Sequence, residues 1–176
     1  GVVAAKKSKL TKVTVPNTAN CKGYGLNVTE VGDNAFKAMK KLKKVTFGAN
    51  VKVIGKAAFS NCKKLNKINF KNVTTIGNNA FAGCKALKKL TIGSKVTTIG
   101  KNAFKKCTKL KTVVIGKSVK TIKAKAFTKD NKIKKITFKG KKLKTVKKNA
   151  LSSIVNNNIK TKNTKLKGNK KAIKVF

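Results

Sequence analysis

Lysine dominates the chemistry that this 176-residue chain could perform. All 46 basic residues are lysine, histidine is absent, and the carboxylates are Glu30, Asp33 and Asp130, so the net charge is +43. A positive field of this size attracts polyanions of any kind. The absence of arginine removes the two-pronged contact with which proteins read phosphate or guanine. The charge therefore indicates either a platform for an anionic ligand or a solvated surface without a specific ligand.

Acid–base and metal chemistry have little support in the residue types. The chain has no histidine, and no nucleophile has a recognisable base beside it, so no catalytic set can be assembled. Cys62, Cys84 and Cys107 are spaced by 22 and 23 residues, which fits no zinc-binding pattern. We interpret these cysteines as buried free thiols that pack like small hydrophobes, with a metal site or a disulfide as the alternative. No catalytic residue, cofactor or metal ligand is predicted.

One recurring pattern must position all of these residues. It reads IGKNAF at Ile99–Phe104, and related strings begin at Val31, Ile54, Ile76, Ile122 and Val146. The starting residues are 23, 22, 23, 23 and 24 positions apart. A fixed period in this range is typical of a solenoid, in which each unit buries its apolar face only by stacking on its neighbours.

Each repeat also contains a string of the form L-x-x-V-x-V, such as LKKVTF at Leu42–Phe47. Its alternation of apolar and polar residues predicts a half-buried strand. The V-x-x-I-G string that follows predicts a second, shorter strand. Glycine at positions 32, 55, 77 and 100 predicts a bend with positive φ. The residues after the bend, such as Asn102–Cys107, are too few for a long helix and predict one α-helical or 3₁₀ turn.

The aligned repeats place like residues in columns. The phenylalanine of the pattern forms one column, and the leading Leu or Ile forms another. Stacked coils would bury these columns as continuous ladders. With parallel strands about 4.8 Å apart, six coils would make a body roughly 30 Å long.

The two ends depart from the repeat. We expect residues 1–30 to form a tail and a hairpin-like cap that includes a first strand, residues 31–153 to form the repeats, and residues 154–176 to form a C-terminal cap or a truncated end. The hairpin is predicted from a strand at 13–15, a turn at 21–25 and a strand at 26–31. Within the last segment, residues 159–161 are strand-like.

The combined pattern resembles the BspA-like leucine-rich repeats, also called the Treponema pallidum type. It reads L-x-x-I-x-I-G followed by V-x-x-I-G-x-x-A-F-x-x-C, and the resemblance extends over residues 10–153. The resemblance implies an α/β solenoid that is right-handed, with a parallel sheet on its concave face and short strands and helical turns opposite. It also implies a secreted or surface-bound protein, since several such proteins are adhesins for host matrix proteins or other microbes. The family shares no catalytic site or cofactor.

The polar x positions of the strands form the candidate ligand-binding face. Because coils stack in register, lysines there stand above lysines, and two unit charges about 5 Å apart in water repel by roughly 0.8 kcal/mol before salt screening. The phenylalanines are assigned to the core, so the face lacks the exposed aromatics of single-strand binders. Nucleic-acid binding through charge alone is still expected. The candidate ligand-binding residues are Lys43, Lys44, Lys67, Lys88, Lys89, Lys111, Lys134 and Lys135.

These features predict a non-enzymatic, extracellular or cell-surface binding module. It would be a monomer, possess no membrane span, and recognise a host matrix protein or an anionic polysaccharide, as an adhesin does. No apolar run approaches the ~20 residues that a membrane-spanning helix needs. The alternative is a structural or wall-associated spacer that anionic wall polymers hold through its lysine-rich surface.

Overall fold

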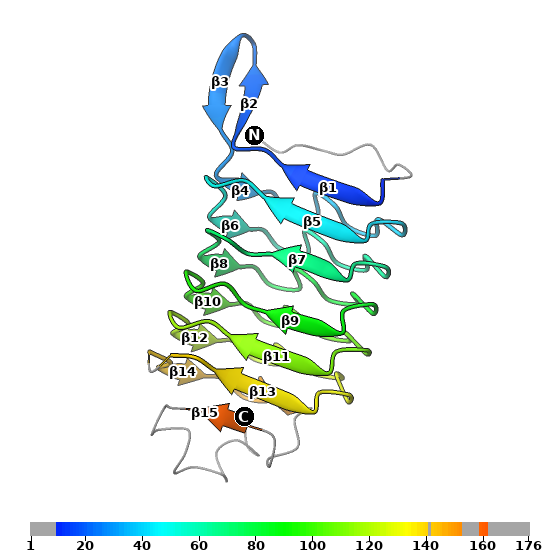
Figure 1. Cartoon of the computed structure of the whole chain (residues 1–176), viewed down its shortest axis with the longest axis vertical. Helices are drawn as coiled ribbons and strands as arrows, with labels where there is room; N and C mark the ends of the chain where they lie inside the picture. Colours follow the sequence, from blue (N-terminus) through cyan, green and yellow to red (C-terminus); the bar gives the residue numbers. More distant parts are fainter. Residues whose placement is uncertain (1–9, 141, 153–158, 162–176) are drawn as a thin grey trace.

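The computed structural model describes residues 10–140, 142–152 and 159–161, and it shows a stack of similar coils (Figure 1). Each coil contributes strands to two faces of the stack. The long-strand face contains β1 (Lys12–Val15), β5 (Lys44–Phe47), β7 (Lys67–Asn69), β9 (Lys89–Thr91), β11 (Thr112–Ile115), β13 (Lys135–Phe138) and β15 (Ile159–Thr161). The short-strand face contains β4 (Glu30–Val31), β6 (Val53–Ile54), β8 (Thr75–Ile76), β10 (Thr98–Ile99), β12 (Thr121–Ile122) and β14 (Thr145–Val146).

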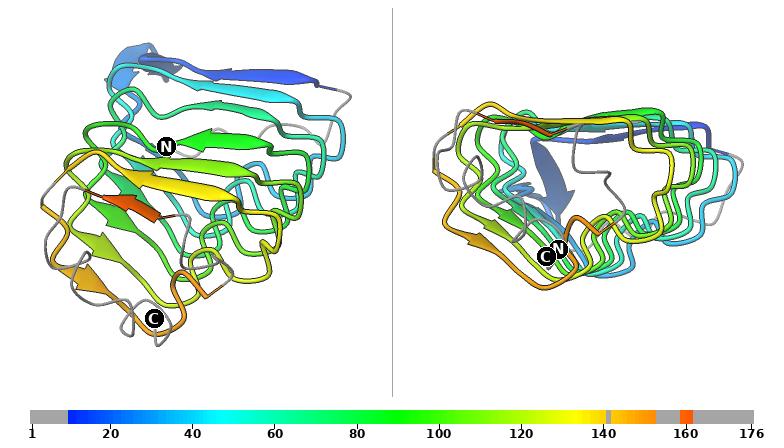
Figure 2. Two further views of the ribbon diagram at one scale, coloured as in Figure 1. Left: turned by 60° about the horizontal axis from the view of Figure 1, so that its bottom comes forward. Right: turned by 90° about the horizontal axis from the view of Figure 1, so that it is seen from below.

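Strands on both faces pair in parallel with the equivalent strands of neighbouring coils. The short-strand face is one sheet of order β14-β12-β10-β8-β6-β4, and the long-strand face has two sheets, β1-β5-β7 and β15-β13-β11-β9. Equivalent residues are partners, so that Val45 pairs with Val13 on one side and with Ile68 on the other. The view along the stack shows the two faces enclosing one interior (Figure 2). The predicted parallel solenoid with a period of about 23 residues is confirmed.

Apolar columns fill the interior. The rings of Phe36, Phe59, Phe81, Phe104 and Phe127 stack with centroids 5.0, 5.2, 5.4 and 5.3 Å apart and planes within 8° of parallel. The four rings after Phe36 are fully buried. Burying one such side chain contributes about 1.5–3 kcal/mol, so every coil depends on the presence of its neighbours.

The segment after each short strand is a series of turns. In the coil that contains Asn102, the N–H of Lys105 donates to the Asn102 carbonyl three residues back at 3.0 Å. The next N–H, of Lys106, instead donates to the Thr128 carbonyl of the following coil at 3.0 Å. A helix needs successive N–H groups to bond within the segment. The predicted α-helical or 3₁₀ turn is therefore not confirmed, because alternate N–H groups bond to the next coil.

The glycine column has a different role from the one predicted. None of the four glycines at positions 32, 55, 77 and 100 has positive φ. At Gly55, Gly77 and Gly100 an added Cβ atom would clash with backbone atoms of the preceding coil; at Gly100 it would stand 2.5 Å from the carbonyl carbon of Gly77. These glycines are required because neighbouring backbones approach too closely for a side chain. The positive φ falls two residues later, for example at Asn79 (57°) and Asn102 (56°), and asparagine tolerates this conformation better than most residues.

A hairpin of β2 (Thr18–Cys21) and β3 (Tyr24–Asn27) projects beyond the first coil (Figure 1). Its two-residue tip has φ of 51° at Lys22 and 84° at Gly23, as a type I′ turn requires. The predicted first arm was wrong, because residues 13–15 belong to β1 and pair with β5 of the second coil. Of the predicted second arm at 26–31, only residues 26 and 27 lie in β3. Val13 and Val15 gain more burial in the stack than they would in a two-stranded ribbon.

Near the C-terminus, the strand-like segment at 159–161 is confirmed as β15, which pairs in parallel with β13. Most of the predicted cap at 154–176, and the tail at 1–9, lie outside the described residues. The described part of the chain holds no helix that is long and apolar enough to cross a membrane.

The close backbone approach at the glycine column can be tested by substitution. Gly100→Ala should lower the free energy of unfolding by about 1–3 kcal/mol, as overpacking of a buried site does, measured by urea denaturation. Gly25→Ala is the matched control, since a Cβ atom there meets nothing within 4 Å. Equal stability of the two variants would contradict this role of Gly100.

Candidate functional site

All eight candidate lysines lie exposed on the long-strand face. Lys44, Lys67, Lys89 and Lys135 begin their strands, and their side chains point outward because the residues after them, such as Val45, face the core. Each of the other four comes directly before the first residue of β5, β9, β11 or β13; they are Lys43, Lys88, Lys111 and Lys134.

Parallel register assembles the strand lysines into what we call the lysine row, formed by Lys12, Lys44, Lys67, Lys89 and Lys135. Lys44 is the partner of both Lys12 and Lys67. Thr112 interrupts the row between Lys89 and Lys135 and pairs with both. Lys12 was not among the predicted binding residues. Its string LTKVTV has the same form as the other strand strings, and this form puts Lys12 in the same column as Lys44.

A second row of outward side chains runs beside the lysine row. Two residues further along each strand stand Thr14, Thr46, Asn69, Thr91, Val114 and Thr137. We call the five polar members the hydroxyl–amide row. It is in register too, because Thr46 pairs with Thr14 and Asn69, and Val114 pairs with Thr91 and Thr137. Each coil thus presents an ammonium group and, in most coils, a hydroxyl or amide group on one surface.

Aromatic side chains are not part of this surface among the described residues. Eight of the nine phenylalanines are buried in the core, and Phe176 lies outside the described residues. The single tyrosine, Tyr24, is 73% exposed but lies on the projecting hairpin. The surface can therefore offer charge and hydrogen bonds to a ligand, without a platform for stacking rings.

The cysteine column is part of the core. Each of the three thiols donates a hydrogen bond to the phenylalanine carbonyl of the preceding coil. The pairs are Cys62 to Phe36 at 3.0 Å, Cys84 to Phe59 at 3.3 Å and Cys107 to Phe81 at 3.4 Å. Burial raises the pKa of Cys62 to about 11 and the pKa of the other two thiols well above the usual value. The predicted burial of these thiols is confirmed, and the raised pKa makes them poor nucleophiles.

Asp130 occupies the cysteine column in the fifth coil, and its side chain is fully buried. Burial raises the pKa of its carboxyl group from 3.8 to about 8, against a smaller opposing effect of a hydrogen bond with the backbone of Cys107. The charged form is disfavoured because the core cannot solvate it. The other two carboxylates, Glu30 and Asp33, are exposed on the first coil, so the three acids are not brought together.

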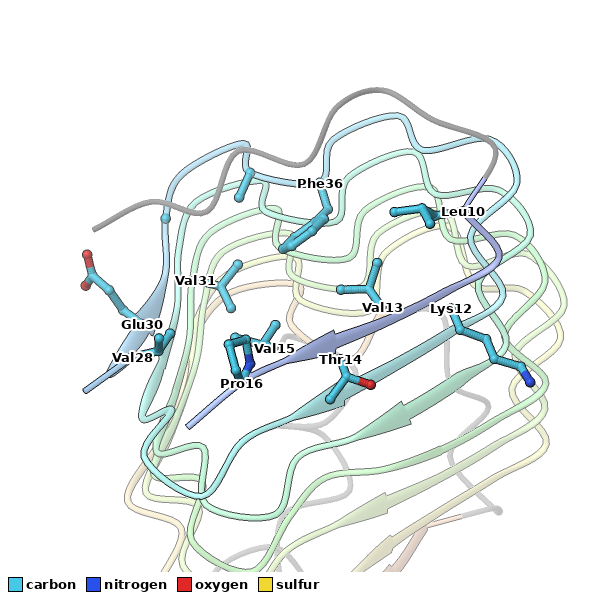
Figure 3. A pocket seen from close by; sticks show the side chains of 12 residues that line it. Leu10, Lys12, Val13, Thr14, Val15, Pro16, Val28, Glu30, Val31 and Phe36 are labelled. Atoms are coloured by element: carbon cyan, nitrogen blue, oxygen red, sulfur yellow. The ribbon is translucent and has the colours of Figure 1, made fainter. Parts of the chain in front are cut away.

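An apolar hollow of about 240 Å³ lies at the first coil (Figure 3). It is lined chiefly by core-type side chains, including Leu10, Val13, Val28, Val31 and Phe36. Few polar groups converge on it, and the side chain of Glu30 points away from the others (Figure 3). Its lining continues the core columns, so the hollow is the end of the stacked core.

Comparisons with known sequences identify the repeat. The family described as BspA type leucine rich repeat region matches in six copies, over residues 4–115 and 29–158. No curated protein shows a significant match to the chain.

Solved structures share the coil architecture. The chain is similar to the T. pallidum leucine rich repeat protein, with 30% identity and a TM-score of 0.68 over 74% of this chain and 59% of that one. It is also similar to a leucine rich cell surface protein from Faecalibacterium prausnitzii, with 26% identity and a TM-score of 0.69 over 89% of this chain and 49% of that one. The chain thus spans less than two thirds of either solved chain.

The buried carboxyl of Asp130 should make stability depend on pH. The folded chain keeps this proton up to about pH 8, whereas the unfolded chain releases it near pH 4. Unfolding therefore releases a proton between these values, and the stability of the folded state falls as the pH rises through that window. Asp130→Asn should remove this loss. Relative to the parent, its free energy of unfolding should rise by up to about 1.4 kcal/mol for each pH unit within that window.

Thermal unfolding at pH 5 and pH 8 measures this difference. Glu30→Gln, which removes an exposed carboxyl, is the matched control. If Asp130→Asn and the parent change in parallel between the two pH values, the buried carboxyl does not titrate as described.

Repulsion among lysines should make the fold more stable at high salt. The screening length falls from about 30 Å at 0.01 M to about 3 Å at 1 M salt, so the midpoint of thermal unfolding should rise with sodium chloride. The triple variant Lys44→Gln, Lys67→Gln, Lys89→Gln should unfold at a higher temperature than the parent at low salt and respond less to added salt. A midpoint of thermal unfolding that falls with added salt would show that repulsion among the lysines does not contribute much to the stability of the fold.

Proposed function

The chain belongs to the BspA-type leucine-rich repeat family, and on this basis we propose that it is a non-enzymatic binding module displayed on the cell surface or secreted. The similar protein from F. prausnitzii is described as a leucine rich cell surface protein, which supports this location. Repeat solenoids of this kind offer extended surfaces for binding. The ligand in this proposal is a protein or an anionic glycan, as for an adhesin.

The observation that carries the proposal is the ordered array of lysines on the long-strand face. Eight predicted lysines and Lys12 are all exposed there, and within each of the two sheets paired strands hold those of the lysine row in register. Because the strands fix the backbone of this array, a ligand needs to order only the lysine side chains, at about 0.5–1.5 kcal/mol for each one that is immobilised. Catalysis is not part of the proposal, because neither the thiols nor the carboxylates form a reactive set on this face.

A structural spacer held by anionic wall polymers is the second candidate. Lysines are exposed on other sides as well, such as Lys52, Lys120 and Lys144 at the short-strand face and Lys101 in the turns. Charge spread in this way would bind a polyanionic matrix from any direction, and it would bind nucleic acid without sequence preference in vitro. In either role we propose that the chain acts as a monomer, because its charge opposes self-association.

A glycan and matrix-protein array separates the two candidates. The chain is applied at physiological salt and again at about 0.5 M, where binding by exposed charge alone should fade. The binding-module proposal expects a small set of ligands that persist at high salt and are lost when the lysine row is changed to glutamine. Weak binding to every anionic spot that vanishes at high salt would favour the spacer and reject the module.

A further inference from the structure

We infer that the long-strand face binds a linear polyol phosphate, a polymer of small hydroxylated units joined by phosphodiester bonds, and that this polymer lies along the stack and crosses the strands. The inference rests on the proposed function, since it takes the same face as the binding surface and names the class of ligand. It is carried by the geometry of two rows of side chains.

The lysine row gives the direction of the ligand. Lys12, Lys44 and Lys67 follow one another through paired strands, and Lys89 and Lys135 flank Thr112 in the lower sheet. With parallel strands about 4.8 Å apart, six coils extend this row over roughly 24 Å. Along a single strand, by contrast, the next outward residue is threonine, asparagine or valine. A linear polyanion meets a line of lysines, interrupted only at Thr112, when it crosses the strands.

The hydroxyl–amide row gives the second chemical group. In β5, Lys44 and Thr46 both face outward because Val45 between them is 1% exposed. Alternate residues of a strand are roughly 7 Å apart on one face. A hydroxyl can donate and accept hydrogen bonds, so this row matches hydroxyl groups of a ligand whose phosphates lie on the lysines. Polyol phosphates carry both groups in every unit.

The residue types also bear on which polyanion binds. The chain has no arginine, so neither carboxylate nor phosphate can be held by a two-pronged contact. Single-stranded nucleic acid gains affinity from aromatic side chains on which its bases stack, and the described phenylalanines are in the core. Lysine binds phosphate as a point charge on a flexible stem, which tolerates a mismatch between the spacing of the coils and that of the polymer.

Titration calorimetry with poly(glycerol phosphate) of defined lengths tests the direction of the ligand. The affinity should rise with length until the polymer spans the row, roughly 24 Å, and change little beyond that. The comparison polymers are inorganic polyphosphate, polygalacturonate and oligothymidylate, each at about 200 mM salt, where contacts by charge alone are weakened. Poly(glycerol phosphate) should bind most tightly per charge.

Two variants with the same loss of charge locate the site. The row variant carries Lys44→Gln, Lys67→Gln and Lys89→Gln, and the control variant carries Lys52→Gln, Lys120→Gln and Lys144→Gln. The row variant should bind poly(glycerol phosphate) roughly tenfold more weakly, and the magnitude of its salt slope should fall by about 2. The control should stay within about twofold of the parent. Thermal unfolding checks that both variants are folded.

A third variant tests the hydroxyl contacts. Thr46→Val, Thr91→Val and Thr137→Val keep the β-branched shape and remove three hydroxyl groups. Binding of poly(glycerol phosphate) should weaken, whereas binding of polyphosphate, which lacks hydroxyl groups, should not change. The same effect on both polymers, or no effect on either, would overturn the assignment of this row.

The remaining outcomes separate this inference from the proposed function. Equal losses in the row and control variants, or preferential binding of polygalacturonate or oligothymidylate, would overturn the polyol phosphate. A protein ligand from the array that depends on the lysine row, without tight binding of poly(glycerol phosphate), would also overturn it while leaving the binding module intact. Absence of any ligand for the long-strand face would reject both.

Discussion

Register between neighbouring coils is the constraint on which the rest of this structure depends. A coil of about 23 residues cannot enclose its own apolar side chains, so the rings in the column from Phe36 to Phe127 cover one another at about 5 Å from coil to coil. Backbone hydrogen bonds between coils hold that register in strands and turns alike. A slip of one residue would turn inward side chains outward, and the close backbone contact at Gly100 leaves no room for such a slip.

The same register that buries the core also orders the surface. Because Val45 and Phe47 of β5 are held inward, Lys44 and Thr46 are held outward. The equivalent residues of the other long strands face outward on the same side. Rows of lysine and threonine are thus a by-product of stacking, and they bring like charges close together. Apolar burial and backbone bonding must outweigh this repulsion. The surface residues can vary without disturbing the core, so a common scaffold can carry different ligand chemistry.

Exceptions within the columns show what the stack tolerates. The cysteine position accepts Met39 in the first coil and Asp130 in the fifth, both buried. An insertion is accommodated as the β2–β3 hairpin, which leaves the stack between β1 and β4 and returns where Val28 donates to the Asn17 carbonyl at 2.8 Å. The first kind of exception keeps the side chain buried although its size or polarity changes, whereas the second depends only on the two ends of the insertion lying close together.

The sequence by itself determined the period, the strands of the repeats, the inward columns of leucine, phenylalanine and cysteine, and the outward position of the lysines. These features follow from apolar patterns that are local and repeated. Only the tertiary structure decided that Gly77 and Gly100 serve close packing, that Asn79 and Asn102 take the positive φ, and that Lys106 bonds to the next coil and so prevents a helical turn. Each of these depends on atoms more than twenty residues away, which no local pattern contains.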